Sequence, residues 1–298
     1  MKNKSRIIIP IMALFMVTGC AQSTFGDETK LNVITSFNAM SELCIAIGGD
    51  KINLLTIIPT GTEPHDFEPT ITDVVNLSKA DIFVINGLNM ETWAEELINT
   101  ADNDNLILCV ASENSVARIN TDENETSEHG QYDPHMWLSL NKAQEMAATI
   151  AGYFYTSDPV NATYYEANLD NFNNSLEELA NEYVDKFASV ANKDFVTGHA
   201  AFGYLCDEYG LEQNSIEDMF AEGEPTTAQL ASLVEYCRTN NVSTIFSEML
   251  SSQEISTTLA SEVDAEVVQI YTIESAENNM SYYERMEYNL EKIYQSLK

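Results

Sequence analysis

The sequence predicts an α/β protein of two lobes, each with a mainly parallel sheet, joined by one long helix. Short apolar runs of strand length alternate with helical patterns through the first half of the chain, and the same alternation returns in its last third. Between them lies a single helical pattern of about 30 residues. The length of 298 residues suits about two domains. Because ligands bind beyond the carboxyl ends of parallel strands, two lobes facing each other predict a site in the cleft between them.

The N-terminal segment is predicted to be a targeting signal followed by a tether, rather than part of the fold. A few basic residues precede an apolar run that is too short for a comfortable membrane-spanning helix, which is typical of a signal peptide. The small residues before Cys20 resemble the lipobox of bacterial lipoproteins, although Val17 stands where leucine is usual. We therefore expect a lipoprotein signal peptide over 1–19, a lipidated Cys20 and a tether over 20–29. An ordinary signal peptide or a buried Cys20 is the alternative.

The first lobe is predicted over residues 30–156. Its helical patterns follow strand-like runs, and Gly48-Gly49 is a suitable stop for the first helix. The strand-like runs are Leu31–Ser36, Leu54–Pro59, Asp81–Asn86 and Leu106–Val110. The helical patterns are Phe37–Gly48, Thr70–Lys79, Met90–Thr100 and Leu140–Tyr155. A polar, acidic loop over 111–133 interrupts the alternation, and its length indicates a functional or mobile segment.

The linking segment, 157–192, is predicted to hold the long helix that braces the two lobes. Asp158 can cap the start of this helix, and Pro159 suits its first turn. Apolar or aromatic residues then recur every three or four positions from Tyr165 to Val190. This spacing places them on one face of a helix about 45 Å long. A coiled-coil segment is the alternative.

The second lobe is predicted over residues 193–298, where strands and helices alternate again. The strand-like runs are Asp194–Thr197, a weaker stretch at Ser215–Met219, Val242–Phe246 and Val267–Tyr271. The helical patterns are Ala201–Tyr209, Thr226–Thr239, Ser252–Val263 and Tyr282–Leu297. No close sequence repeat relates this lobe to the first.

The charge of the chain limits the partners it can have. The 14 Lys and Arg residues stand against 47 Asp and Glu residues, for a net charge of −33. Nucleic acid is excluded as an expected partner, because binding it depends on basic groups that neutralise phosphates. A cationic ligand is compatible with this field, although acidic charge also simply keeps an exposed protein soluble.

The cysteines beyond Cys20 do not form a metal or redox motif. Cys44, Cys109, Cys206 and Cys237 show no C-x-x-C spacing. We expect buried free thiols. A disulfide is the alternative, because the predicted location lies outside the cytoplasm.

Three of the four histidines and one late carboxylate follow predicted strands. His65 comes after the second strand-like run, and His135 lies on the loop after the fourth. His199 and Glu274 follow the first and last strands of the second lobe. Imidazole suits zinc, copper, iron or nickel, and four protein ligands suit a closed tetrahedral zinc site. A catalytic zinc keeps a position open for water, so this set favours binding over chemistry and predicts no enzyme activity.

Several stretches, in the same order along nearly the whole mature chain, resemble the solute-binding lipoproteins of bacterial ABC importers for zinc and manganese. They are Gly61-Thr-Glu-Pro-His-Asp-Phe-Glu-Pro-Thr70, Lys79-Ala-Asp-Ile-Phe-Val-Ile-Asn-Gly87 with Glu91-Thr-Trp93, Asp133-Pro-His-Met-Trp-Leu138, Asp158-Pro-Val-Asn-Ala162 and Thr197-Gly-His-Ala-Ala-Phe-Gly-Tyr204. The resemblance implies a monomeric, lipid-anchored receptor on the outer face of the cell membrane. It would bind a divalent metal between its lobes and deliver it to a membrane permease.

The resemblance also implies the ligand set. His65 and His135 would come from the first lobe, and His199 from the second. Zinc-binding members usually carry histidine at the third position and manganese-binding members glutamate, so His199 favours Zn²⁺, with Mn²⁺ as the alternative. We expect Glu274 as the fourth ligand, although the Asn-Pro of the family turn is absent before it. Glu248 or water is the alternative, and Glu248 suits a side chain that orients a ligand.

The chain departs from the family pattern at three places. Ala200 replaces the acid or amide that commonly follows the third histidine, and Ser139-Leu140 replaces an Asp-Pro after the second. The 111–133 loop is acidic where many zinc-binding members have a histidine-rich run, and its His129 is expected to be solvated.

Three other functions remain as alternatives. A manganese or iron receptor belongs to the same class. A zinc-dependent hydrolase would need a general base, for which Glu63 or Asp66 is the nominal candidate, but no H-E-x-x-H run exists. A cell-surface adhesin would not require the histidines.

Overall fold

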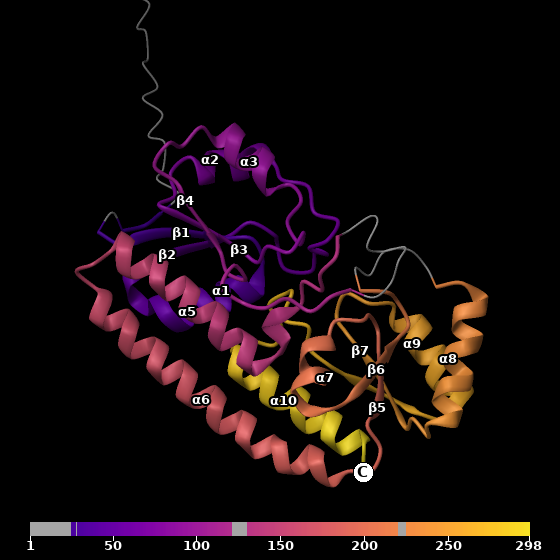
Figure 1. Cartoon of the computed structure of the whole chain (residues 1–298). Coiled ribbons are helices and arrows are strands. Elements are labelled where there is room, and N and C mark those ends of the chain that lie inside the picture. Colours follow the sequence, from indigo (N-terminus) through magenta and orange to yellow (C-terminus); the bar gives the residue numbers. More distant parts are fainter. Residues whose placement is uncertain (1–24, 28, 121–129, 220–224) are drawn as a thin grey trace, which may run out of the picture.

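The computed structural model describes residues 25–27, 29–120, 130–219 and 225–298. Two α/β lobes, each built on a four-stranded parallel sheet, lie side by side and are spanned by one long helix, α6 (Figure 1). This confirms the predicted fold class. The boundaries of the lobes at 30–156 and 193–298 stay a prediction. The signal peptide and Cys20 lie outside the described residues.

The N-terminal sheet has the strand order β2-β1-β3-β4, with every pair parallel. Its central strands are almost wholly buried because helices cover both faces, as all-parallel sheets require. The strands are β1 (Leu31–Thr35), β2 (Ile52–Thr56), β3 (Ile82–Ile85) and β4 (Ile107–Val110). The helices are α1 (Asn38–Gly48), α2 (Ile71–Leu77), α3 (Ala94–Ala101) and α5 (Leu140–Ser157), with short 3₁₀ turns at Gly49–Lys51 and Met136–Leu138.

The C-terminal sheet repeats this design with the order β6-β5-β7-β8. Its strands are β5 (Asp194–Thr197), β6 (Glu212–Ser215), β7 (Thr244–Ser247) and β8 (Glu266–Gln269). Its helices are α7 (Gly203–Tyr209), α8 (Thr227–Thr239), α9 (Gln253–Val263) and α10 (Tyr282–Ser296). The weak strand predicted at Ser215–Met219 is wrong, because the edge strand is the polar Glu212–Ser215. Backbone pairing with β5 fixes its position, and the apolar Ile216 and Met219 come after it.

One hydrophobic core runs through both lobes beneath α6 (Ala162–Ser189). Near its start, Tyr165 packs on Phe154 of α5, and near its end Phe187 packs on Tyr209 of α7, with ring centroids 5.4 and 5.0 Å apart. Phe195 of β5 joins this shared core, whereas the next residue, Val196, faces a smaller cluster formed with α8 and α9. The inner face of the C-terminal sheet therefore belongs to the same packed unit as the first lobe.

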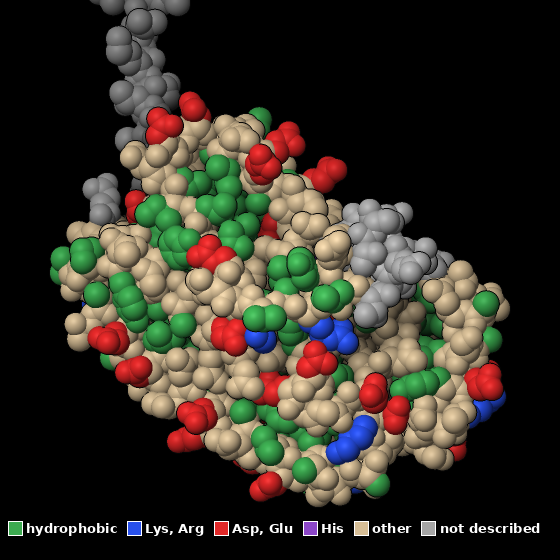
Figure 2. All heavy atoms as spheres, viewed as in Figure 1, with side chains coloured by type: hydrophobic (Ala, Val, Ile, Leu, Met, Phe, Trp, Pro, Cys, Tyr) green, Lys and Arg blue, Asp and Glu red, His purple; other side chains and the backbone are tan. Residues whose placement is uncertain are grey.

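The surface agrees with the strongly acidic composition. Figure 2 shows acidic side chains spread over the viewed face and few basic ones. The four cysteines from Cys44 to Cys237 are buried and free, which confirms that prediction. None of the helices that the structure describes is both long and apolar enough to cross a bilayer.

Truncating Phe187 should destabilise the protein strongly, because its ring fills the junction of α6, α7 and α10. We expect Phe187→Ala to lower the free energy of unfolding by about 3–5 kcal/mol. Val184→Ala on the same helix, where the side chain is half exposed, should change it by less than about 0.5 kcal/mol. Urea unfolding of the metal-free protein measures both changes. If the two variants lost the same free energy of unfolding, the Phe187 ring would not be a main contact between α6 and the core.

Candidate metal centre

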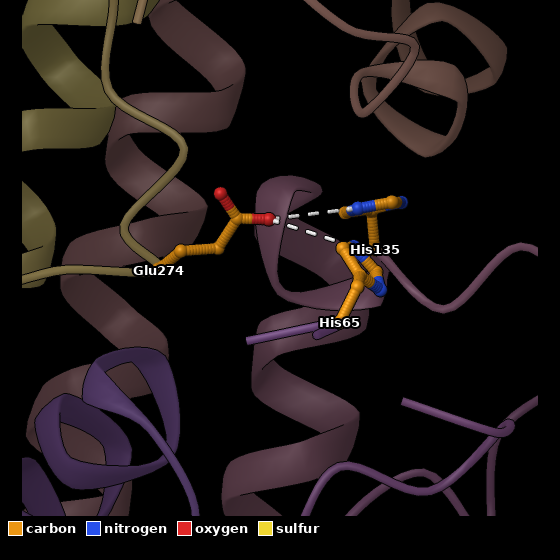
Figure 3. Close-up of side chains that lie close together, drawn as sticks. All are labelled: His65, His135 and Glu274. Atoms are coloured by element: carbon orange, nitrogen blue, oxygen red, sulfur yellow. Dashed lines mark ion pairs between the residues drawn. The ribbon is translucent and has the colours of Figure 1, made fainter. Parts of the chain in front are cut away.

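The four side chains predicted as ligands converge on one point. The Nε2 atoms of His135 and His199 each lie 3.6 Å from Oε1 of Glu274, and Nε2 of His65 lies 4.0 Å from the same oxygen. Figure 3 shows the carboxylate of Glu274 pointing at His65 and His135 across the gap between their segments. Ligand atoms around a tetrahedral zinc with bonds of about 2.0–2.1 Å lie roughly 3.4 Å apart. The three distances to this carboxylate oxygen are therefore a few tenths of an ångström longer than the spacing in a zinc site.

The converging atoms are buried and incompletely satisfied. The side chains of His65, His135, His199 and Glu274 are exposed by 4% or less. Among the residues that the structure describes, none provides a hydrogen-bond partner for Nε2 of His135, Nε2 of His199 or Oε1 of Glu274. Buried polar atoms are normally paired, so a cluster of such atoms aimed at one point fits a metal ion bound between them. The ligand atoms of His65, His135 and Glu274 also lie within 4.8 Å of one another, a spacing that can hold a metal ion.

The segment after β2 carries His65. The chain continues past the strand, where the Ile58 N–H donates to Ser36, and then turns at Pro59–Thr62. Gly61 has a φ of +84°, a conformation that favours glycine. Its N–H donates to Oγ of Ser275 at 2.8 Å, which ties the His65 loop to the residue beside Glu274.

An acidic side chain fixes the orientation of His135. Oδ1 of Asp133 lies 3.0 Å from Nδ1 of His135 and also accepts its backbone N–H. The imidazole therefore keeps Nε2 free for the site, as in metal-binding histidines generally. On the other side, Nδ2 of Asn86 donates to the Pro134 carbonyl. The buried Glu91 in turn accepts the N–H of Asn86.

Glu248 does the same for His199. Its Oε2 lies 3.2 Å from Nδ1 of His199 and accepts the His199 backbone N–H, while its Oε1 accepts the N–H of Gly198. A Cβ added at Gly198 would lie 2.2 Å from Oε2 of Glu248, so only glycine permits this approach. Glu248 thus faces the outer nitrogen of His199 rather than the point of convergence. It supplies the support that Ala200 cannot give.

Glu274 lies on a strained turn after β8. Its Oε2 accepts a hydrogen bond from Thr272 Oγ1 at 2.7 Å, which leaves Oε1 directed at the imidazoles. The preceding residue, Ile273, has a φ of +62°, unusual for a β-branched residue. Asn38 at the start of α1 donates to the Ile273 carbonyl, and Arg285 of α10 donates to that of Ser275. Both lobes thus hold this turn.

The charges of the carboxylate and the imidazoles in the centre oppose the effect of their burial. Burial alone would raise the pKa of Glu274, yet the facing His199 and His135 hold it well below its ordinary value. Burial alone would lower the pKa of His199, yet Glu248 and Glu274 raise it well above 6.5. Asp133 and Glu274 likewise raise the pKa of His135 despite its burial. In the metal-free protein, protons on the imidazoles therefore supply the positive charge.

Two further carboxyl groups, Glu63 and Glu217, lie near the centre, and neither was predicted as a ligand. Burial and the charge of Glu274 raise the pKa of Glu63 to about 8, and its Oε1 accepts the N–H of His65. Burial raises the pKa of Glu217 to about 7, against the opposing effect of His199. Glu63 belongs to the motif around His65, which was a usable signal, whereas Glu217 follows the edge strand that was misplaced. His129 lies outside the described residues.

The arrangement is suited to holding a cation rather than to hydrolysis. Three imidazoles and one carboxylate leave no position for a reactive water in a tetrahedral shell, and zinc prefers this donor set. The four converging side chains are nearly inaccessible to solvent. A surface groove between α2 and α3, lined by Phe67, Ile71 and Trp93 among others, does not include the histidines.

The sequence is similar to known metal-binding and metal-uptake proteins along nearly its whole length. The family model described as zinc-uptake complex component A, periplasmic (ZnuA), matches residues 33–296. A protein of Treponema pallidum (strain Nichols) that is named for metal binding is 40% identical over 294 residues, covering 95% of this chain and 93% of the relative. The high-affinity zinc uptake system protein ZnuA of Bacillus subtilis (strain 168) is 33% identical over 99% of this chain and 98% of its own length. A manganese ABC transporter substrate-binding lipoprotein, PsaA of Streptococcus mitis, is 31% identical over 100% and 99% of the two chains.

The fold of the chain is also similar to that of solved structures over about nine-tenths of its length. A Zn(II)-bound variant of AdcAII from Streptococcus pneumoniae superposes with a TM-score of 0.83 at 30% identity, covering 91% of this chain and 100% of that one. The laminin-binding protein Lmb of Streptococcus agalactiae, described as bifunctional with adhesin and metal-transporting activity, gives a TM-score of 0.82 at 32% identity over 90% and 100% of the two chains.

Zinc binding should release protons at neutral pH. The raised pKa values of His199 and His135 mean that protons occupy these imidazoles in the metal-free protein, and only neutral imidazole binds a metal. Affinity should therefore rise with pH, and the rise should continue above about pH 6.5, where an ordinary histidine is already neutral. Calorimetry at pH 7 in buffers of different ionisation enthalpy measures the protons released. A zinc affinity that is flat between about pH 6 and pH 8 would contradict this.

Proposed function

Because the chain belongs to the family of zinc-uptake complex component A (ZnuA), we propose that it is an extracytoplasmic receptor that delivers zinc to the permease of an ABC importer. The observation that carries the proposal is the convergence of His65, His135, His199 and Glu274 on one buried point. We assign these four residues as the zinc ligands. The strongly acidic surface suits a protein that collects a divalent cation.

Zinc is favoured over manganese by the donor atoms. Imidazole nitrogen binds zinc well, whereas manganese is better served by carboxylate, carbonyl and water oxygens. The centre presents three imidazoles and one carboxylate oxygen. The zinc-uptake relative from Bacillus subtilis and the zinc-bound AdcAII variant support this choice. The manganese relative from Streptococcus mitis keeps a manganese or iron receptor as the alternative.

The protein is proposed to work at the outer face of the cell membrane as a lipid-anchored monomer. Lipidation of Cys20 would attach it there, and the permease would receive the metal from the cleft. Its family consists of binding components of transport systems, and a four-ligand shell supports a role without catalysis.

Attachment to a surface is a second candidate function. The observation that favours it is the similarity to Lmb, described as both adhesin and metal transporter. Replacing the three histidines tests the two functions separately. Zinc binding should be lost, and attachment to immobilised laminin should be unchanged if adhesion does not depend on the metal.

Removal of one proposed ligand should weaken zinc binding much more than removal of the histidine outside the proposed set. The metal-stripped protein is expected to bind one zinc per chain. His199→Ala should weaken binding by more than about 100-fold, because even residues that only orient ligands contribute 10–100-fold. His129→Ala replaces the one histidine outside the proposed set and should leave affinity unchanged. Competition against a fluorescent chelator measures each affinity, and manganese displacing zinc at equal concentration would overturn the assignment of zinc.

A further inference from the structure

The carboxylate of Glu274 presents only one of its two oxygens to the metal centre. Oε1 lies 3.6–4.0 Å from the Nε2 atoms of the three histidines. Oε2 instead accepts the hydrogen bond from Thr272 Oγ1 at 2.7 Å, and both residues are buried. In Figure 3 one oxygen of Glu274 points at the imidazoles and the other points away from them. A carboxylate can bind a metal through one oxygen or through both. The hydrogen bond from Thr272 therefore bears on which of the two modes Glu274 adopts.

The hydroxyl of Thr272 is held in place through the backbone around it. Trp137 Nε1 donates to the Thr272 carbonyl at 2.7 Å, and Thr272 is only 3% exposed. The preceding residue, Tyr271, exchanges two hydrogen bonds with the buried Asn289 of α10. Its N–H donates to Oδ1 of Asn289 at 2.9 Å, and its carbonyl accepts from Nδ2 at 2.7 Å. Breaking such buried bonds is costly, because it leaves polar groups unpaired. The backbone thus fixes the place from which Thr272 donates to Oε2.

The turn is anchored on the other side of Glu274 as well. Nδ2 of Asn38 donates to the Ile273 carbonyl at 3.0 Å, and Nη1 of Arg285 donates to the Ser275 carbonyl at 3.1 Å. Arg285 is fully buried, so its bond to the turn is shielded from water. Side chains from α1 and α10 therefore hold the backbone on both sides of Glu274. The carboxylate keeps the orientation in which Oε1 alone faces the imidazoles.

The other carboxylates that contact the histidines are directed to the outer nitrogens. Oδ1 of Asp133 lies 3.0 Å from Nδ1 of His135, and Oε2 of Glu248 lies 3.2 Å from Nδ1 of His199. These oxygens orient the imidazoles and do not face the point of convergence. Oε2 of Glu274 is bonded to the same carbon as Oε1, so it is the oxygen most readily added to the shell of an ion bound there.

The number of oxygens that Glu274 offers bears on the choice of metal. Three imidazoles and one oxygen make a four-coordinate shell, which zinc prefers. A second oxygen from the same carboxylate would raise the coordination number to five. Manganese favours a larger shell that is richer in oxygen, so it would gain more from the added oxygen than zinc. A group that withholds Oε2 from the ion therefore favours zinc.

We propose that Thr272 is a specificity-determining residue, whose hydroxyl holds Oε2 of Glu274 so that this carboxylate binds the ion through Oε1 alone. The proposal rests on the proposed zinc site and adds to it the residue that sets its preference for a four-coordinate ion. Thr272 does not touch the ion, and it acts through the carboxylate that does. The bonds from Trp137, Asn38 and Asn289 keep the turn in the shape that this hydrogen bond requires.

The first test removes the hydroxyl of Thr272 and keeps the branched shape of its side chain. In Thr272→Val, Oε2 of Glu274 loses its buried donor and turns to the ion, because a buried carboxylate oxygen without a partner is costly. Manganese affinity relative to zinc should rise by about tenfold, the scale on which residues that orient ligands act. Competition titrations with each metal measure this ratio. Equal weakening of both metals would overturn the proposal, because it would show only a general loss of the site.

Cobalt(II) reports the coordination number directly. Cobalt bound to the wild-type protein should show the strong visible absorption of a four-coordinate ion. In Thr272→Val this absorption should weaken as the carboxylate adds its second oxygen. An unchanged cobalt spectrum in the variant would contradict the proposed role of the hydroxyl.

Two control variants separate the hydroxyl from the rest of the side chain and from stability in general. Thr272→Ser keeps the hydroxyl and should keep the wild-type ratio of affinities. Thr149→Val removes a buried hydroxyl from α5, where it donates to the Glu145 carbonyl, and should also leave the ratio unchanged. A raised ratio in either control would overturn the assignment of Thr272, because loss of a methyl group or of an unrelated buried hydroxyl would then suffice.

The wild-type protein provides a test that does not depend on how the valine variant folds. Infrared difference spectra between the zinc-bound and metal-free protein show the carboxylate stretching bands that change on binding, and Glu274→Gln identifies those of Glu274. The symmetric and asymmetric bands lie far apart when one oxygen binds the metal and close together when both do. We expect the wide separation, and a narrow one in the wild-type protein would overturn the proposal. A wild-type protein that binds no zinc would instead refute the proposed function itself.

Discussion

The structure depends on a single carboxylate oxygen that faces three imidazole nitrogens where water cannot reach. Oε1 of Glu274 lies 3.6–4.0 Å from each Nε2, and each group alone would be costly to bury. Their mutual attraction offsets part of that cost only while the protons stay on the imidazoles. A divalent ion offers a better solution, because it replaces the protons and bonds all four atoms at once. The surrounding chain therefore keeps three imidazoles and one carboxylate buried together, and a bound cation would pair with all four of these groups.

The shared core limits how that place can open. Phe195 and Phe246 of the second sheet belong to the same packed cluster as the strands of the first, and α6 covers both. A wide hinge motion between the lobes would separate side chains of this core. That is costly, because protein interiors are close-packed and resist deformation. Opening must then fall on segments outside the core. Between β2 and α2, the residues Pro59–Gly61 are exposed and lie outside this cluster, whereas Trp137 is fully buried within it.

Sequence reasoning recovered much of this because the signals were local. The strand–helix alternation gave both sheets, the spacing from Tyr165 to Phe187 gave the buried face of α6, and the motifs gave four side chains that the structure brings together. The failures have a common cause. The position of β6 depends on pairing with β5 rather than on its own polar residues, and the anchoring of His135 depends on Tyr204, Thr272 and Glu208, which are far away in sequence. Local patterns do not contain such contacts.

The choice of metal follows from how little oxygen the closed centre offers. Manganese needs more oxygen donors than one carboxylate and has the weakest intrinsic affinity of the divalent first-row metals. Glu63 is the obvious source of another donor, but its pKa of about 8 keeps it protonated at neutral pH while the site holds no metal. Glu217, with a pKa of about 7, carries only part of a negative charge there. The four converging side chains offer three imidazole nitrogens and one carboxylate oxygen, and this donor set suits zinc better than manganese.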